Sequence, residues 1–314
     1  MPILKANEPL PARPIVIGYY GEPGVRKTSI AHTAENPLLI DFDRGVARSY
    51  GRKDAIIVDN WDEVLKYEQE GLYKNYKTIV IDTAKAALDD FLMSYVVKQD
   101  FKLQKNKLQA YGAIGDAFKL FLNNRRNEGA DVIIIAHSKK DEDTKKMIPD
   151  VTGQSYNLML RVADQIGFVS TKNNQATIQW YPTDVTVGKN TANLPDAVIP
   201  DKSLPEFKTF MSDIITKVKT SIVEESEAQR EAIEKSENYQ KQIAAVKTTD
   251  DINLIVTPVQ ALPVYLKNPL NQLIAEKAKE KGFVYDKKEK AFKMPDPPAE
   301  NKTLAKAAEQ DMPF

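Results

Sequence analysis

Residues 14–28 read PIVIGYYGEPGVRKT, and this stretch decides the fold. Its first half is an apolar run, residues 14–20, that stops at Gly21 and predicts a buried strand. Its second half, residues 21–28, matches the pattern G-x-x-x-x-G-K-[ST] at every fixed position but one, because Arg26 stands where glycine is expected. A helix is predicted directly afterwards, over residues 27–35. Strand, glycine-rich loop and helix in this order are the context in which the pattern has chemical meaning.

Each fixed position of the loop has a chemical reason. Gly21 lets the chain turn tightly out of the strand, and Gly24 lets successive backbone N–H groups point at phosphate oxygens. Lys27 places a cation on the β and γ phosphates, the Thr28 hydroxyl binds Mg²⁺, and the start of the helix adds a favourable dipole. We therefore predict ATP and Mg²⁺ as cofactors, with the nucleotide held by Gly21, Glu22, Pro23, Gly24, Val25, Arg26, Lys27, Thr28 and Ser29.

Arg26 is the departure from the pattern. It adds a Cβ and a long side chain to a close-packed loop, and two outcomes are open. The side chain either points outward and leaves a working loop, or distorts the loop and weakens nucleotide binding. Loops of replicative helicases resemble this one and carry alanine at that position, so a Cβ alone is tolerated.

Apolar strands alternate with helices through the first two thirds of the chain. Strands that are apolar throughout, separated by helices, indicate a parallel sheet covered on both faces. The later strands alternate more and are predicted nearer the sheet edge. We predict an α/β fold with strands at 14–20, 37–42, 55–58, 77–82, 131–136, 165–170 and 175–187 and helices at 27–35, 61–67, 84–101 and 108–127.

The pattern changes after residue 203. Residues 203–206, Ser-Leu-Pro-Glu, read as a capping box, and residues 224–242 carry six acids against three bases, which predicts an exposed helix or helical linker. Residues 268–269, Asn-Pro, predict a helix start, Gly282 predicts its end, and residues 283–293 resemble a hairpin. We predict a core over 1–203, a helical linker over 204–247, a small helical and hairpin module over 248–294, and a disordered tail over 295–314.

Composition excludes several classes of protein. The 314 residues include no cysteine, which excludes disulfides, thiolate nucleophiles, zinc fingers and iron–sulfur clusters. No apolar run approaches the ~20 residues of a membrane span, and no signal peptide is recognisable, so we expect a soluble cytoplasmic protein without membrane contacts. Lys plus Arg and Asp plus Glu are 44 each, and a zero net charge argues against a generally basic nucleic-acid coat but leaves local patches open.

An acid belongs with the loop. Residues 79–82, Ile-Val-Ile-Asp, form an apolar strand ending in Asp82, which we predict to hold a water on Mg²⁺. With both motifs placed, roughly residues 12–200 resemble the RecA-type ATPases, so the resemblance implies a RecA-like core over residues 1–203. It also implies a catalytic set of Lys27, Asp43, Asp82, His137 and Lys189.

Three members of that set rest on the resemblance. Asp43 ends a segment, residues 39–43, similar to the RecA strand whose final Glu activates water; the alternative is a cap before Arg44. His137 stands where RecA proteins carry the γ-phosphate sensor, normally Gln; the alternative is a satisfied surface histidine. Lys189 resembles a lysine that reaches a neighbouring subunit's nucleotide; the alternative is a solvated loop lysine.

The resemblance also implies partners. The polar segment 138–157 occupies the place of the RecA loop that contacts single-stranded DNA, which makes Lys139, Lys140, Lys145 and Lys146 DNA-binding candidates. The last residues, 309–314, resemble the tail tip of bacterial single-stranded-DNA-binding proteins, which implies docking onto that protein or onto proteins that read its tail; chance is the alternative. The residues of the tip are Asp311, Met312, Pro313 and Phe314.

Among RecA-like proteins, the short core resembles the phage Sak-type single-strand annealing ATPases, which implies the cytoplasm of a bacterial host. The leading hypothesis is an ATP-binding recombination protein that binds single-stranded DNA, promotes annealing or strand pairing with coupled hydrolysis, and forms a homo-oligomeric ring or filament. One alternative is a nucleotide-gated loader or adaptor with weak hydrolysis. Another is a helicase subunit.

Overall fold

The computed structural model describes residues 13–100, 108–287 and 289–295. The described chain forms two compact units, one ending at Glu224 and the other beginning at Glu225. In the part of the chain so described, no helix is both long enough and apolar enough to cross a membrane.

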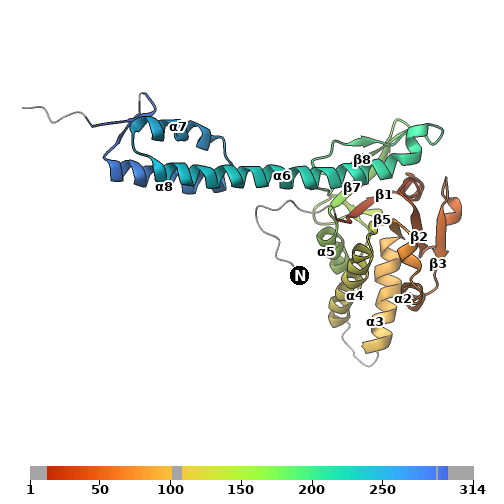
Figure 1. Cartoon of the computed structure of the whole chain (residues 1–314). Helices are drawn as coiled ribbons and strands as arrows, with labels where there is room; N and C mark the ends of the chain where they lie inside the picture. The colour runs from red at the N-terminus through yellow and green to blue at the C-terminus, as the bar shows by residue number, and fades with distance from the viewer. Residues whose placement is uncertain (1–12, 101–107, 288, 296–314) are drawn as a thin grey trace, which may run out of the picture. The chain divides into compact units, whose positions relative to one another are not determined.

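The first unit is built on a large, mainly parallel sheet in the order β10-β8-β7-β1-β5-β4-β2-β3 (Figure 1). The strands from β7 to β3 run parallel, whereas β8 and β10 pair antiparallel at the other edge. Two short strands are added, β6 on β5 and β9 on β7. The bounds are β1 Val16–Gly21, β2 Pro37–Asp41, β3 Asp54–Ile57, β4 Thr78–Asp82, β5 Asp131–Lys140, β6 Met147–Pro149, β7 Gln165–Lys172, β8 Gln175–Gln179, β9 Lys189–Asn190 and β10 Ala197–Val198.

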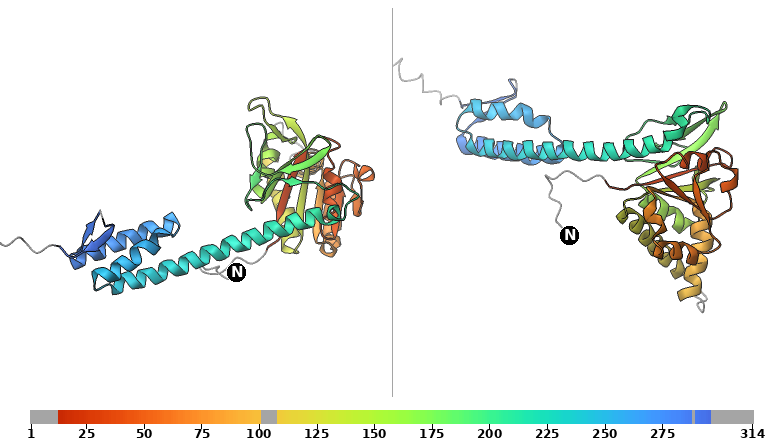
Figure 2. Two further views of the ribbon diagram at one scale, coloured as in Figure 1. Left: turned by 90° about the horizontal axis from the view of Figure 1, so that it is seen from above. Right: turned by 45° about the vertical axis from the view of Figure 1, so that its right-hand side comes forward.

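Helices cover both faces of the sheet, which confirms the predicted α/β fold. Side chains of β1 alternate between two cores: Val16 and Tyr20 pack with α2 to α5, and Ile17 and Tyr19 pack with α1 and the start of α6. Figures 1 and 2 show α3 and α4 on one face and the start of α6 on the other. The bounds are α1 Lys27–Ala31, η1 Val46–Arg48, α2 Trp61–Gln69, η2 Leu72–Asn75, η3 Ala86–Leu92, α3 Met93–Asp100, α4 Leu108–Asn127, α5 Gly153–Val162, η4 Pro205–Thr209 and α6 Phe210–Ala245.

Three local predictions for this unit were wrong. Helix α1 ends at Ala31 instead of residue 35, because the N–H groups of Thr33 and Ala34 donate only three residues back and Asn36 then turns with a φ of 39°. Strand β8 ends at Gln179 instead of residue 187, since Pro182 cannot donate to a sheet ladder. The capping box at 203–206 does not form, because the Ser203 hydroxyl donates to Asp201 Oδ1 at 2.7 Å.

The second unit consists of the end of α6, two further helices and a hairpin. Its helix α7, Thr249–Gln260, begins with a capping box between Thr248 and Asp251. Helix α8, Val264–Lys281, starts four residues before the predicted Asn268, because Pro263 supplies a helix start and Pro269 is accommodated inside the helix. Gly282 ends α8 with a φ of 73°, and the hairpin expected over 283–293 is present as β11 Val284–Asp286 and β12 Ala291–Lys293.

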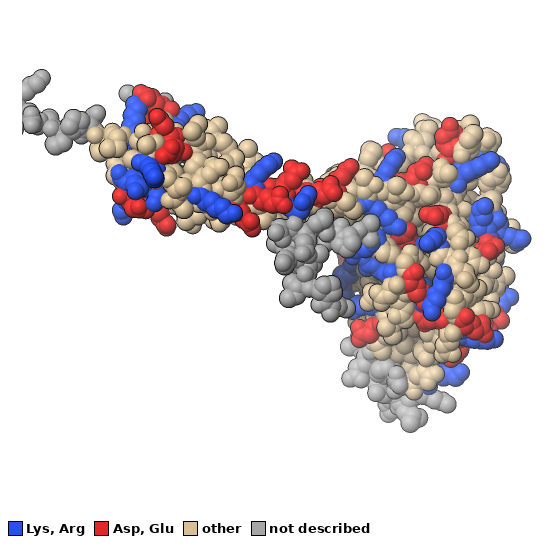
Figure 3. Space-filling model, in the orientation of Figure 1, with Lys and Arg blue, Asp and Glu red and all other residues tan. Residues whose placement is uncertain are grey.

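The acidic residues between 224 and 237 gather along the middle of α6 (Figure 3). This part of α6 is mostly exposed, as its polar sequence predicts. Bases elsewhere in the second unit offset these acids, so the first unit, residues 11–224, carries 29 Lys and Arg against 28 Asp and Glu and is itself close to neutral.

Candidate functional site

The predicted site residues converge at the carboxyl edge of the parallel strands. Strand β5 lies between β1 and β4, and its register sets His137 opposite Gly21. Strand β2 sets Asp41 opposite Asp82 on β4. Because the carboxyl ends of parallel strands meet at one sheet edge, the loop after β1, the end of β5, the end of β4 and the turn after β2 face one another.

The loop between β1 and α1 has the backbone that its glycines predict. A Cβ at Gly21 would lie 2.2 Å from the carbonyl oxygen of Val169, so the close approach of β7 requires glycine there. Gly24 has a φ of 84°, in the left-handed region that glycine adopts freely. Arg26 has a φ of 70°, so the arginine adopts the conformation for which the pattern normally uses glycine. The loop therefore keeps a left-handed backbone despite the substitution.

Lys27 is buried at the base of this loop. Its ammonium donates to the carbonyl oxygens of Gly21 at 2.9 Å and Glu22 at 2.7 Å. Burial lowers the pKa of Lys27 to about 8, and the nearby Asp82 and Asp43 carboxylates oppose that shift. A cation with so little hydration binds an arriving anion at a smaller desolvation cost than an exposed lysine does.

Thr28 and Asp82 form an oxygen-rich pair suited to a hard cation. The Thr28 hydroxyl donates to Asp82 Oδ2 at 2.7 Å. Burial raises the pKa of Asp82 to about 6, and the Thr28 hydrogen bond partly opposes this. Hydroxyl and carboxylate oxygens are the ligands that Mg²⁺ prefers, so these residues fit the predicted metal.

His137 and Asp43 face each other beside the loop. The His137 Nε2 and Asp43 Oδ2 atoms are 4.0 Å apart, and His137 Nδ1 is buried without a hydrogen-bond partner among the described residues. Burial and the charge of Lys27 lower the pKa of His137, so its imidazole is neutral at pH 7. A neutral imidazole can donate one hydrogen bond and accept another.

Asp41 holds the turn that carries Asp43, a role that the sequence reasoning missed. The fully buried Asp41 carboxylate accepts from the backbone N–H groups of Gly45 and Val46, both at 2.9 Å. The capping function considered for Asp43 therefore belongs to Asp41, and the Asp43 carboxylate is left for the pocket. The available signal was an acid at the end of an apolar strand, the same signal that pointed to Asp82.

A pocket of about 700 Å³ opens between these groups. Its walls include nine of the predicted residues, from the loop and from three strand ends: Pro23, Gly24, Arg26, Lys27, Thr28, Ser29, Asp43, Asp82 and His137. Gly21, Glu22 and Val25 belong to the loop but are not part of the wall.

The pocket also has aromatic and basic groups that the sequence did not indicate. Tyr50 contacts Phe207 edge-on with ring centroids 6.0 Å apart, and the Lys202 ammonium lies 5.2 Å from the centre of the Tyr50 ring. The Ser29 hydroxyl accepts from the Tyr50 backbone N–H at 3.0 Å and so fixes this segment against α1. Arg48 lines the same wall. No sequence signal connects residues 202 and 207 with a loop near residue 25.

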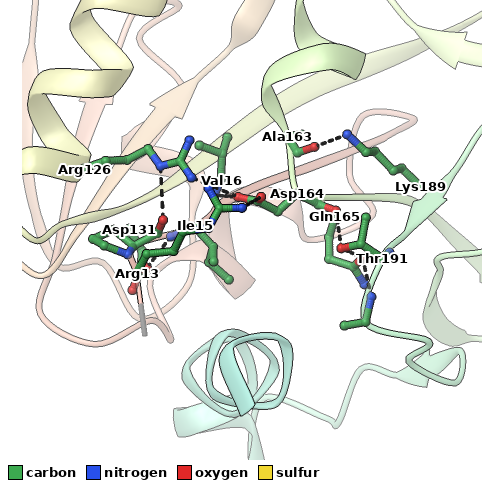
Figure 4. Close-up of polar contacts among 12 residues, drawn as sticks. Arg13, Ile15, Val16, Arg126, Asp131, Ala163, Asp164, Gln165, Lys189 and Thr191 are labelled. Atoms are coloured by element: carbon green, nitrogen blue, oxygen red, sulfur yellow. Dashed lines mark hydrogen bonds and ion pairs between the residues drawn. The ribbon is translucent and has the colours of Figure 1, made fainter. Parts of the chain in front are cut away.

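Lys189 is not part of this pocket wall. Its ammonium donates to the carbonyl oxygen of Ala163 at 2.6 Å (Figure 4) and to that of Leu160 at 3.2 Å, at the end of α5. In the described structure the lysine therefore closes a helix end within its own chain. It lies instead beside Arg126 and Asp164 at a second pocket of about 370 Å³.

The segment proposed to contact DNA is more ordered than a loop. Strand β5 continues to Lys140, a turn follows, β6 pairs back, and α5 starts at Gly153. The Tyr20 hydroxyl anchors the hairpin through the carbonyl oxygen of Met147 at 2.8 Å. The segment is not polar throughout, because Ile148 and Pro149 are buried and pack the returning strand against the sheet.

The four lysines of this hairpin differ. Lys139 donates to the carbonyl oxygen of Val151 at 2.8 Å, and Lys146 donates to that of Thr183 at 2.9 Å. Lys140 and Lys145 are exposed, which leaves these two ammonium groups better placed for an anionic strand. The predicted tip, Asp311 to Phe314, lies outside the described residues.

Comparison with known proteins identifies a family and similar solved structures. A family model described as an AAA domain matches residues 13–192. No curated protein matches the sequence. The crystal structure of the RadB recombinase is similar, with 14% sequence identity and a TM-score of 0.35, over 53% of this chain and 80% of that chain.

Proposed function

This chain belongs to the AAA domain family, in which the phosphate loop implies nucleotide binding, typically with Mg²⁺; from that premise we propose that it is a RecA-like, ATP-hydrolysing recombination protein that acts on single-stranded DNA. The observation that carries the proposal is the single pocket lined by Lys27, Thr28, Asp43, Asp82 and His137. Lys27 and Thr28 begin α1, Asp43 follows β2, Asp82 ends β4 and His137 lies on β5.

The pocket supplies a role for each group. Lys27 binds the phosphates, and Thr28 with Asp82 holds the cation, which withdraws charge from the phosphate oxygens when bound. Asp43 accepts the proton of the attacking water, since its carboxylate is not used by the turn that presents it. His137 donates a hydrogen bond from its neutral ring toward the phosphate side.

Steady-state ATP hydrolysis with and without single-stranded DNA tests this function. DNA-stimulated turnover that is lost in Lys27→Ala and retained in Lys208→Ala is the expected result. Lys208 is an exposed cation of η4 and is not part of the pocket wall, so it controls for a change of net charge. Turnover that persists in Lys27→Ala contradicts the proposal.

The hairpin supports the choice of DNA as partner. Lys140 and Lys145 are exposed on a segment whose backbone is joined to the site, because the Asp150 N–H donates to the carbonyl oxygen of His137 at 2.7 Å. Replacing both lysines by alanine should reduce the slope of log affinity against log salt by about 1.4. The double variant Lys208→Ala/Lys217→Ala, on η4 and α6, should leave that slope unchanged.

The proposal has three further parts. The protein assembles into a ring or filament of identical subunits, it promotes annealing, and it docks onto partners through residues 311–314. Electron microscopy with single-stranded DNA and a non-hydrolysable ATP analogue tests DNA binding and assembly together. Deleting residues 309–314 should leave DNA binding intact and abolish capture of proteins that read such tails. Unchanged capture contradicts the docking role.

A second function, a nucleotide-gated loader or adaptor with weak hydrolysis, is favoured by one observation. Lys189, the candidate for a cross-subunit cation, is held by two carbonyl groups of its own chain. Without a cation from a neighbour, hydrolysis is expected to be slow. Tight ATP binding with no DNA-stimulated turnover would select this function over the first.

A further inference from the structure

Arg26 adopts a backbone conformation that arginine disfavours. Its φ of 70° and ψ of 19° place it in the left-handed region, where a Cβ meets the following carbonyl group. The residue directly precedes α1, and its carbonyl oxygen accepts from Ile30 at 3.0 Å. Glycine would make the same backbone contacts without strain. A strained backbone of this kind is typical of positions where the side chain has a function, so we looked for a contact that the Arg26 guanidinium can make.

The side chain of Arg26 lies on the pocket wall. It is 37% exposed, and its Nη2 atom is 4.0 Å from Asp201 Oδ2. With Lys27, Arg48 and Lys202, it gives the wall four cations against the two carboxylates of Asp43 and Asp82. An excess of positive charge at a pocket that already contains a phosphate-type loop favours a polyanionic ligand.

Asp201 is set in place independently of Arg26. Its Oδ1 atom accepts from both the backbone N–H of Ser203 at 3.0 Å and the Ser203 hydroxyl at 2.7 Å. These hydrogen bonds lower the pKa of Asp201, and Arg26 adds to the shift, so the carboxylate is ionised at neutral pH. Its other oxygen, Oδ2, faces the guanidinium.

The contact between Arg26 and Asp201 is loose enough to be exchanged. At 4.0 Å it exceeds hydrogen-bond length, and both side chains are more than a third exposed, so solvent screens the pair. A guanidinium forms shorter, bidentate hydrogen bonds with phosphate oxygens, which are stronger than a screened ion pair. A phosphate in the pocket therefore competes well for this side chain.

We propose that Arg26 is a second phosphate-binding cation of the pocket, beside Lys27. Asp201 holds the Arg26 guanidinium until phosphate binds, and the guanidinium then pairs with the phosphate instead of the carboxylate. The inference rests on the proposed nucleotide-binding function. It explains why arginine is kept at a left-handed position: the side chain binds the ligand. The departure from the loop pattern then adds to phosphate binding.

Calorimetric titration of the full chain with AMP-PNP and Mg²⁺ tests the proposal. Two variants separate side chain from backbone: Arg26→Ala removes the guanidinium and keeps the strain, whereas Arg26→Gly removes both. We expect each to bind about tenfold more weakly than the unaltered chain, with Lys208→Ala as the matched control at the unaltered affinity. Unaltered affinity in both Arg26 variants overturns the proposal.

Asp201→Asn tests the exchange. Removing the competing carboxylate should raise the affinity for AMP-PNP two- to threefold when Arg26 is present and leave it unchanged in Arg26→Ala. An equal rise in both backgrounds indicates general charge removal and overturns the role given to Asp201. Lys27→Ala separates the role of Arg26 from nucleotide binding itself. If Lys27→Ala does not weaken binding of AMP-PNP, the proposed nucleotide-binding function is wrong. If Lys27→Ala weakens binding and Arg26→Ala does not, only the role of Arg26 is wrong.

Discussion

The two edges of the central sheet use the same kinds of side chain for opposite purposes. At the amino edge, Asp164 accepts from the Val16 N–H and from Arg13, both at 2.9 Å, and Asp131 accepts from the Ile15 N–H at 2.9 Å and Lys219 at 2.8 Å (Figure 4). At the carboxyl edge, no residue that the structure describes makes a hydrogen bond to the buried His137 Nδ1. The acids of the amino edge hold backbone N–H groups and cations of the fold, whereas the charged groups of the carboxyl edge converge on a pocket that a ligand can enter.

Removing a cation at the carboxyl edge should produce the largest functional effect. Lys27→Ala is expected to weaken ATP binding by about 100-fold or more, equal to roughly 3 kcal/mol, because the phosphates lose their buried counter-charge. The free energy of unfolding should stay the same or rise, since a desolvated ammonium is removed. Calorimetric titration and urea denaturation measure the two quantities. A large loss of stability would place Lys27 with the structural residues of the other edge.

Removing an acid at the amino edge should lower the stability of the protein and leave ATP binding almost unchanged. Asp164→Ala leaves the buried Val16 N–H and the Arg13 guanidinium without their acceptor, and should lower the free energy of unfolding by about 1–3 kcal/mol. ATP affinity should change less than twofold, because this carboxylate is not part of the site pocket. The exposed Asp116→Ala is the control for stability. Loss of ATP binding without loss of stability would contradict the comparison.

The pH dependence of stability should separate the edges too. Lys27 has its pKa lowered to about 8 in the folded protein, whereas an unfolded lysine titrates near 10.4. Between these values the unfolded chain binds the extra proton, so the Lys27 contribution raises the free energy of unfolding as pH rises from 8 to 10.4. The gain is of the order of 2 kcal/mol. Urea denaturation of the unaltered chain and Lys27→Met across this range isolates it, and identical pH profiles would contradict the burial of this charge.

The contribution of Asp82 to the free energy of unfolding changes with pH in the opposite direction, and does so at lower pH. Its pKa is raised to about 6, above the unfolded value, so the folded state binds the proton more tightly and stability falls as pH rises toward 6. The site therefore keeps two charges that burial disfavours at pH 7. Such a cost is tolerated where function requires the groups.

Most residues that short motifs single out in the sequence lie together at the carboxyl edge, and their roles there remain predictions. The loop before Lys27 and the apolar strand before Asp82 each combine a residue type with a strand end, and parallel topology brings strand ends together. Asp41 and Asp43 share one such end, and only the hydrogen bonds at Gly45 and Val46 show which acid holds the turn. That distinction depends on backbone geometry, which residue identity does not encode.

Long-range placement accounts for what the sequence could not predict. Lys202 and Phe207 reach the pocket from more than 170 residues beyond the loop, and no periodicity connects them with Tyr50. Likewise, the Ser203 hydroxyl could cap a helix start or donate to Asp201, and in the structure it donates to the Asp201 carboxylate. Local patterns predict what a side chain is able to do, and tertiary contacts decide among the options.

The sequence motif and the structure give Lys189 different places. The motif predicts a contact with nucleotide, at the carboxyl edge, whereas the structure has the lysine at the amino edge. The RecA resemblance predicts a cation for a neighbour's nucleotide, yet its ammonium closes the end of α5 at the amino edge. If the structural role holds, Lys189→Ala lowers the free energy of unfolding by about 1 kcal/mol and changes DNA-stimulated hydrolysis less than threefold. Urea denaturation and a hydrolysis assay at saturating DNA measure both. A loss of turnover above tenfold, with unaltered stability and ATP affinity, would instead show that the lysine leaves those carbonyl groups on assembly and acts on a neighbouring subunit.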